Sequence, residues 1–402
     1  MRRVRGLDGP GLPELRRRAR RASSPNVVTG ARHLYVHLPF CSSRCGYCDF
    51  VTVVGRGGEH GDYVDALLRE LELERAHLAP ELETIYLGGG TPTLTDAASL
   101  ARLLDALPAA GEVTVEANPE TVTPELAALL ASRVDRVSVG AQTFSPRLLQ
   151  TLGRVARPDD VRRALYRLRD AGIGNISLDL IYGIPGQEPA DLARDLAEAL
   201  ALEPEHVSAY ELEAKPGTRF THAHGAELER QAESMETYFE RVVETLTAAG
   251  YRWYETANFC RAQSKDTAAR DLRAKHNLGI WLGRDYLGLG VGAVSTIESR
   301  RWRNAPSLAR YVAALERSLE DDAVRPPREH EELPAQVRDT ERVMLGLRLD
   351  EPLPLAGLET SLDEGELERL MRGGLVAHRD GFLTLTKRGR FLGGGVTARL
   401  LV

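Results

Sequence analysis

The chain has 402 residues, of which 43% are hydrophobic and 27% are charged. This composition is ordinary for a globular protein, and the length suggests two to three domains. No apolar run approaches the roughly 18 residues that a membrane-spanning helix needs. The formal net charge is −6, but residues 1–21 hold eight Arg against Asp8 and Glu14, so that segment carries +6 and the remainder −12. Because a nucleic-acid binder presents a basic folded surface, the charge gives no support for such a partner.

The Arg-rich start, residues 1–30, lacks the apolar core of a signal peptide. We expect a disordered tail or a wrongly assigned start codon, with a transit peptide and an anionic-lipid contact as the alternatives. The expected location is therefore cytoplasmic, and a peripheral association with the inner face of the membrane stays open.

Strand-like and helix-like segments alternate between residues 31 and 250. Six β–α units in series predict a parallel sheet with right-handed crossovers, so the expected fold is α/β, a partial (β/α)6 TIM-like barrel. Its chemistry should collect at the carboxyl ends of the strands. The predicted helices are Asp62–Leu78, a segment ending at Leu107, Pro158–Ala171 and Gln231–Ala249. The predicted strands are Leu34–His37, Thr84–Leu87, Val113–Glu116, Arg136–Gly140, Ile176–Leu180 and Val207–Tyr210.

The last third of the chain differs in composition. Residues 251–320 form an aromatic-rich extension that holds all three Trp residues, which we interpret as packing residues, although Trp281 could face a planar ligand. Charged, Pro-containing residues 320–334 predict a linker. Residues 335–402 predict a small winged-helix-like domain, with helices near Val337–Leu347 and Asp363–Arg372 and a hairpin over Leu375–Leu385.

Three of the four cysteines, Cys41, Cys45 and Cys48, fall within eight residues, and Cys260 is a lone thiol. Thiolates are the usual ligands of iron–sulfur clusters, and three of them on a [4Fe–4S] cluster leave one iron open to a chelating ligand. A zinc site lacking a fourth ligand is the alternative, but structural zinc usually has two cysteine pairs. A second signal is Gly88-Gly-Gly-Thr-Pro92 directly after a predicted strand, where glycines permit close backbone approach to a ligand.

Together these motifs resemble the radical S-adenosylmethionine superfamily, and more closely the group that contains oxygen-independent coproporphyrinogen III oxidase and the HemW heme chaperones. The resemblance covers roughly residues 31–400. The matching segments are Tyr35–Cys41, Gly88–Thr93, Val115–Glu120, Ser138–Phe144, Asp179–Gln187, Tyr254–Phe259, Tyr286–Ala293 and Arg301–Asn304.

The resemblance implies roles at the matching positions. Cys41, Cys45 and Cys48 would ligate the [4Fe–4S] cluster. Glu116 and Asp179 would accept hydrogen bonds from an ammonium or from ribose hydroxyls. The residues implied to line the S-adenosylmethionine site are Tyr35, Tyr47, Gly89, Gly90, Thr91, Glu116, Gln142, Arg154 and Asp179, and among them Arg154 is suited to the methionine carboxylate.

Two features favour the chaperone branch over the oxidase. The oxidase carries a further Cys two residues after the third cluster ligand, where this chain has Phe50. The segment His276-Asn-Leu-Gly-Ile280-Trp281 is similar to a chaperone motif whose His is linked to heme binding, with Ile280 replacing a Tyr. Imidazole is a common axial ligand of heme iron, although a buried structural histidine is the alternative for His276.

The resemblance therefore implies a heme carrier that binds a [4Fe–4S] cluster, S-adenosylmethionine and heme. Its partners would be heme and membrane heme acceptors such as respiratory enzymes, and a homodimer is open. The alternative is a radical enzyme acting on a porphyrin, such as the oxidase itself. A third option is an S-adenosylmethionine-binding scaffold with a structural cluster.

Overall fold

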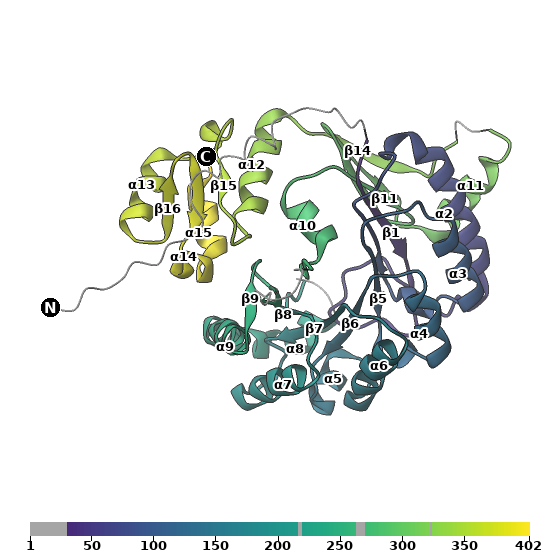
Figure 1. The fold of residues 1–402 in the computed structure, drawn as a ribbon, viewed down its shortest axis with the longest axis horizontal. Coiled ribbons are helices and arrows are strands. Elements are labelled where there is room, and N and C mark those ends of the chain that lie inside the picture. The colour runs from purple at the N-terminus through teal and green to yellow at the C-terminus, as the bar shows by residue number, and fades with distance from the viewer. Residues whose placement is uncertain (1–29, 216–218, 263–269, 322–323) are drawn as a thin grey trace.

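The computed structural model describes residues 30–215, 219–262, 270–321 and 324–402. The tail predicted over residues 1–30 falls almost wholly outside these ranges. Figure 1 shows a strongly curved sheet with helices on its outer face and a smaller lobe at the C-terminal end of the chain.

Six parallel strands form the centre of the sheet and confirm the predicted partial barrel. They lie in the order β1-β4-β5-β6-β7-β8, so each strand is paired with the next one along the barrel. Their bounds are β1 His33–Leu38, β4 Thr84–Gly89, β5 Val113–Ala117, β6 Arg136–Gln142, β7 Ile176–Tyr182 and β8 His206–Glu211.

Helices follow the strands and cover the outer face of the barrel (Figure 1). The predicted helix starting at Pro158 is confirmed. Proline favours the first helical position because its φ is preset and its missing N–H would have no acceptor there. The sequence analysis missed α8. The helices of this region are α2 His60–Glu74, α3 Ala97–Ala106, α4 Pro124–Ala131, α5 Pro146–Leu152, α6 Pro158–Asp170, α7 Pro189–Ala201, α8 Arg219–Gln231 and α9 Met235–Ala248.

Each barrel strand separates apolar from polar side chains with a period of two. In β6, Val137 and Val139 are fully buried in the main hydrophobic core, whereas Arg136, Ser138 and Gly140 line a cavity. In β7, Leu178 belongs to the same core and Asp179 lines the same cavity. The apolar side chains pack in the core under the outer helices, and the alternate side chains line a polar lumen inside the barrel.

Residues 251–332 extend this sheet at both edges rather than forming a separate layer. β10 pairs antiparallel with β8 and carries β9 outside it, whereas β11 pairs parallel with β1 and is followed outward by β12, β13 and β14. The bounds are β9 Tyr251–Trp253, β10 Asn258–Arg261, α10 Lys275–Trp281, β11 Tyr286–Leu289, β12 Val294–Ile297, β13 Arg300–Asn304, α11 Leu308–Arg317 and β14 Arg328–Glu332.

The linker predicted over residues 320–334 is wrong in part, because β14 lies within it. β14 is an outermost strand, and most of its side chains are exposed and charged. Charged side chains protect an exposed edge from pairing with other chains. Because these residues are charged, the sequence of β14 lacks the alternation of apolar and polar residues by which a half-buried strand is predicted.

The C-terminal lobe has its own hydrophobic core, built from residues between Val343 and Leu400. The predicted hairpin is confirmed, and Asp380 and Gly381 adopt φ of 52° and 79° in its turn. The elements are α12 Ala335–Gly346, β15 Leu353–Pro354, α13 Glu364–Arg372, β16 Val376–Arg379, β17 Phe382–Leu385, α14 Lys387–Phe391 and α15 Gly393–Leu400.

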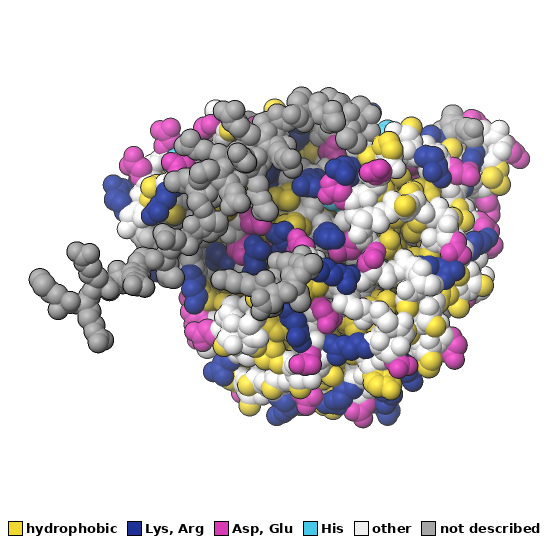
Figure 2. Space-filling view, viewed as in Figure 1, with side chains coloured by type: hydrophobic (Ala, Val, Ile, Leu, Met, Phe, Trp, Pro, Cys, Tyr) yellow, Lys and Arg dark blue, Asp and Glu magenta, His cyan; other side chains and the backbone are white. Residues whose placement is uncertain are grey.

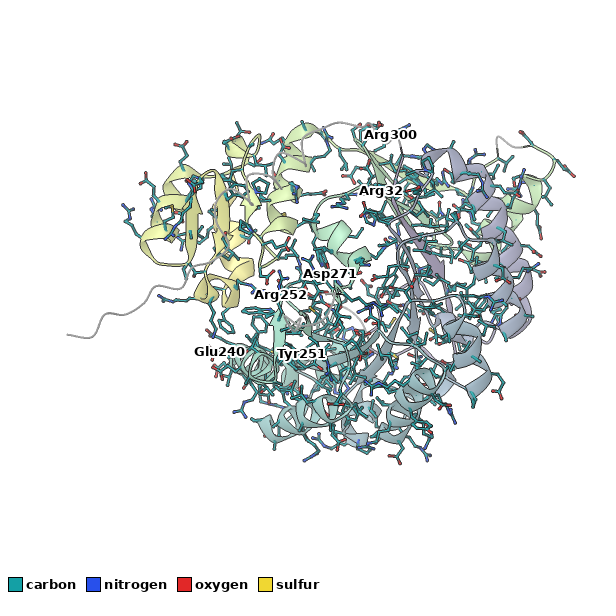
Figure 3. The ribbon with its side chains drawn as sticks, in the orientation of Figure 1. Arg32, Glu240, Tyr251, Arg252, Asp271 and Arg300 are labelled. Carbon is teal, nitrogen blue, oxygen red and sulfur yellow. The ribbon has the colours of Figure 1, made fainter. Side chains whose placement is uncertain are left out.

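Arginine side chains join this lobe to the barrel. Arg390 lies 3.6 Å from the ring centroid of Trp253 and donates to the Trp253 carbonyl at 2.9 Å. Arg252, labelled beside the lobe in Figure 3, pairs with Asp350 at 2.8 Å. The contact between the two parts therefore combines ion pairs with an aromatic stack.

The helices of the described ranges include no candidate for a membrane span. Within the described ranges, no helix is both long and apolar enough to cross a bilayer. On the face drawn in Figure 2, acidic and basic side chains are interspersed rather than separated by sign.

Candidate functional site

One cavity of about 610 Å³ opens at the carboxyl ends of the barrel strands. It unites eleven of the thirteen residues predicted as site residues. The eleven that line it are Cys41, Cys45, Cys48, Tyr47, Gly89, Gly90, Thr91, Glu116, Gln142, Arg154 and Asp179. The structure therefore brings these eleven residues together at the end of the barrel where the sequence analysis expected the chemistry.

The cysteine loop leaves the barrel after β1 and runs between two short paired strands, β2 Phe40–Cys41 and β3 Val53–Val54. All three thiols are half-buried and unbridged. The Cys48 amide donates to the Cys45 carbonyl at 3.2 Å, which forms a tight turn between the second and third thiols.

No three His, Cys, Asp or Glu side chains of the described residues converge on one point where a single metal ion could bind. The three thiols instead share a cavity wall, as a multi-iron cluster requires of its ligands. The donor set of three thiols fits a [4Fe–4S] cluster with one iron free of protein ligation.

A histidine fastens this loop to the barrel. His37 Nε2 donates to the Val51 carbonyl at 2.8 Å, and the Tyr35 hydroxyl lies 3.0 Å from His37 Nδ1. Burial lowers the pKa of His37 to about 4, so the ring is neutral and can accept at Nδ1 while donating at Nε2.

The glycine run packs against the cysteine loop too closely for side chains. A Cβ on Gly90 would lie 2.5 Å from the Pro39 carbonyl carbon, and Gly89 has a φ of 113°. The next residue, Thr91, is 2% exposed, and its Oγ1 lies 3.5 Å from Cys41 Sγ. The glycines therefore allow the backbone of this run to lie close to the cysteine loop.

Two carboxyl groups occupy neighbouring positions on the cavity wall. Glu116 accepts from the Tyr86 hydroxyl at 2.7 Å and from the Gly89 amide at 3.1 Å. Asp179 accepts from Ser138 at 2.9 and 3.1 Å and from Ser177 at 3.1 Å. Burial raises the pKa of Glu116 to about 7 and also raises the pKa of Asp179.

Gln142 is the last residue of β6, and the Arg154 side chain contacts the same carboxyl end of this strand. Gln142 has a φ of 65° at a bulge in this strand, a backbone conformation uncommon for a residue other than glycine. Arg154 Nη2 donates to Asn118 Oδ1 at 2.8 Å and to the Gly140 carbonyl at 2.9 Å, and Nη1 lies 3.9 Å from Cys45 Sγ. This arginine therefore places positive charge beside the cysteine loop.

Tyr35 and His276 do not line the cavity. Tyr35 stacks on Tyr86, with ring centroids 6.2 Å apart. His276 is 5% exposed, its Nδ1 lies 2.9 Å from Thr84 Oγ1, and its ring stacks on Tyr86 at 5.1 Å. Burial lowers the pKa of His276 to about 3, so the imidazole is neutral. Its neighbour Asn277 reaches the cavity instead.

The sequence analysis missed several polar residues of the cavity wall. The signal that could have found them is the period of two, because they alternate with core residues within predicted strands. The missed residues are Tyr86, Arg136, Ser138, Ser208 and Tyr210 from the strands, and Asn118 and Asn277 beyond them.

Comparison with known proteins agrees with this geometry. Residues 35–199 match the Radical SAM superfamily model, and residues 333–392 match the HemN C-terminal domain model. The heme chaperone HemW of Mycobacterium tuberculosis is 38% identical over 381 residues, which cover 92% of this chain and 94% of that protein. HemW of Bacillus subtilis is 33% identical, with 91% and 98% covered.

A solved structure shows the same fold. Coproporphyrinogen III oxidase (HemN) of Escherichia coli superposes with a TM-score of 0.76 at 21% identity, over 92% of this chain and 90% of that one. This likeness bears on the fold alone. With the cysteine loop, the glycine run and nearly end-to-end identity above 30%, the chain belongs to the HemW heme chaperone family of radical S-adenosylmethionine proteins.

Proposed function

We propose that this protein is a heme carrier that holds a [4Fe–4S] cluster and S-adenosylmethionine in the cavity and delivers heme to membrane acceptors such as respiratory enzymes. The observation that supports it most is the match to HemW chaperones over more than nine-tenths of the chain. The cavity supports the cofactor part, because it unites three thiols with the polar residues expected to bind S-adenosylmethionine.

In this proposal each group of cavity residues has a separate task. Cys41, Cys45 and Cys48 hold the cluster, whose open iron would bind the amino-acid end of S-adenosylmethionine. Glu116 attracts the positive charge of that ligand, and Arg154 attracts its carboxylate. When bound, the cluster with S-adenosylmethionine supplies one-electron chemistry at the sulfonium.

Heme binding through His276 requires a rearrangement of α10. In the structure the His276 ring is buried against Thr84 and Tyr86, so no face of it is open to a heme-sized ligand. We propose that heme ligation by His276 involves withdrawal of this helix from the barrel lumen. Its neutral imidazole is the form that coordinates iron.

The first experiment concerns heme. Heme is titrated into the reconstituted protein and into His276→Ala, with absorption spectra and affinity as readouts. His378→Ala is the matched control, because His378 lies on the β16 strand of the C-terminal lobe. Loss of the wild-type spectrum only in His276→Ala would support ligation by His276. An unchanged spectrum and affinity would remove His276 as the ligand without removing heme binding.

Coproporphyrinogen oxidase activity is the second candidate function, and the match of residues 333–392 to the HemN C-terminal domain model is the observation that favours it. Against it, Phe50 lines the cavity at the position of the oxidase's extra cysteine and is 62% exposed. The test incubates the reduced, reconstituted protein with S-adenosylmethionine and coproporphyrinogen III. Formation of protoporphyrinogen would overturn the carrier proposal.

Delivery and assembly need their own measurements. Heme transfer from loaded protein to an apo-cytochrome in lipid vesicles tests delivery, with free heme at equal concentration as the control. Light scattering with and without the cluster tests whether a homodimer forms and whether the cluster is needed for it. Co-sedimentation with anionic vesicles tests peripheral membrane association.

A further inference from the structure

A buried guanidinium lies in the barrel lumen without a hydrogen-bond partner among the described residues. Arg136, the first residue of β6, is 2% exposed and lines the cavity. Its Nε atom is enclosed and makes no hydrogen bond. No hydrogen bond or ion pair joins the Arg136 guanidinium to any residue in the described ranges.

The nearby carboxyl groups are already engaged elsewhere. Glu116 is bonded by a tyrosine hydroxyl and a backbone amide, and Asp179 is bonded by two serine hydroxyls. Glu112, which is 3% exposed, accepts from the Lys275 amide at 3.0 Å. The positive charge of Arg136 lowers the pKa of all three carboxyls, against the larger opposing effect of burial. Arg136 therefore lies near negative charge, but its hydrogen-bond donors remain unused.

Arg154, the other deeply placed arginine of the cavity, has a different environment. Its Nη2 is held by the Asn118 side chain and the Gly140 carbonyl beside the cysteine loop. Arg136 precedes Gly140 by four residues on β6, a strand length of about 13 Å. In this cavity Arg154 is thus held beside the cysteine loop, whereas Arg136 has unused donors nearer the opposite end of β6.

Buried hydrogen-bond donors without an acceptor are unfavourable, and buried arginines usually bind carboxylates or phosphates. We infer that Arg136 is the receptor for a carboxylate of the molecule that fills this cavity. The planar guanidinium can grip both oxygens of such a group. A volume of about 610 Å³ is within the range typical of small-molecule sites.

Two sources could supply this carboxylate: the methionine end of S-adenosylmethionine, for which Arg136 would then replace Arg154 as the receptor, or a propionate of heme. The second source rests on the proposed carrier function and the first does not. In either case Arg136 orients the ligand along the barrel axis, because the cysteine loop and Arg136 lie at different depths of one cavity.

The experiment compares each ligand with a form that lacks the carboxylate. Reconstituted protein is titrated with S-adenosylmethionine and its decarboxylated analogue, and with heme and heme dimethyl ester. Wild type should prefer the carboxylate form of at least one pair by about 10- to 100-fold, the range of a charge-assisted hydrogen bond. The pair that shows an Arg136-dependent preference identifies the source.

Three variants assign that preference. Arg136→Met should abolish it, with circular dichroism of the variant as the check that it is folded. Arg136→Lys should retain part of it. Arg163→Gln, an arginine of the outer helix α6 paired with Asp160, is the matched control and should keep the full preference.

Equal affinity of wild type for both members of both pairs would overturn the inference, and this measurement needs no variant. Preferences in Arg136→Met equal to those of wild type would overturn it too. If wild type binds neither heme nor its ester, the carrier proposal fails, while the S-adenosylmethionine pair still decides the role of Arg136.

Discussion

The buried carboxyl of Glu116 should make the stability of the apo-protein fall as the pH rises. Its pKa is raised to about 7 from a model value of 4.5, with burial as the largest cause. A carboxyl with a raised pKa holds its proton more tightly in the folded state, so its favourable contribution is complete below pH 4.5 and is lost as the pH rises through 7.

The size of this effect follows from the shift. About 2.5 pKa units correspond to about 3 kcal/mol in the free energy of unfolding. This figure is an upper bound, because Glu116 also faces the cavity, where water can reach it. Glu116→Gln has no titrating group at this position. Between pH 5 and pH 8, the free energy of unfolding of wild type should therefore fall relative to that of the variant, by no more than about this bound.

The assay is urea unfolding of the apo-protein, followed by the near-ultraviolet circular dichroism of the tryptophans, at both pH values. Ser42→Ala changes an exposed cavity residue that carries no titrating group and should give parallel pH profiles for variant and wild type. Parallel profiles for Glu116→Gln as well would refute the reasoning, because they would mean that Glu116 titrates alike in the folded and unfolded states.

Three further predictions follow from particular contacts. Gly90→Ala places a Cβ 2.5 Å from the Pro39 carbonyl and should weaken S-adenosylmethionine binding by about 10- to 100-fold in calorimetry, whereas Gly58→Ala, with no atom within 4 Å, should have no effect. Arg348→Met strands the fully buried Glu255, which it contacts at 2.7 Å, and should cost about 3–5 kcal/mol in urea unfolding, against less than about 1 kcal/mol for Arg369→Met in an exposed pair with Glu366. Cys45→Ser should abolish the iron–sulfur absorption of the reconstituted protein, whereas Cys260→Ser, which removes a buried thiol outside the cavity, should retain it.

The sequence by itself determined the central barrel strands and most of the cavity wall. Short apolar segments separated by helical patterns are a local signal, and the carboxyl ends of parallel strands must meet at one edge. The family resemblance implied that the residues from Cys41 to Asp179 form one site, and the position of most of them at strand ends agrees with it. Only the tertiary structure decided which inward-facing side chains are satisfied, because hydrogen-bond partners such as Tyr86 and Glu116 are distant in sequence.

Three features depended on contacts that no local pattern encodes. β14 forms because β13 offers it an edge, although its own residues are charged and exposed. His276 is buried because α10 packs onto β4, whereas its motif left a heme ligand and a buried structural histidine open. The Nε of Arg136 lies in the lumen without an acceptor, because the nearby carboxyl groups of Glu112, Glu116 and Asp179 are bonded to other donors. Burial and pairing are properties of the assembled barrel, so a strand read alone cannot supply them.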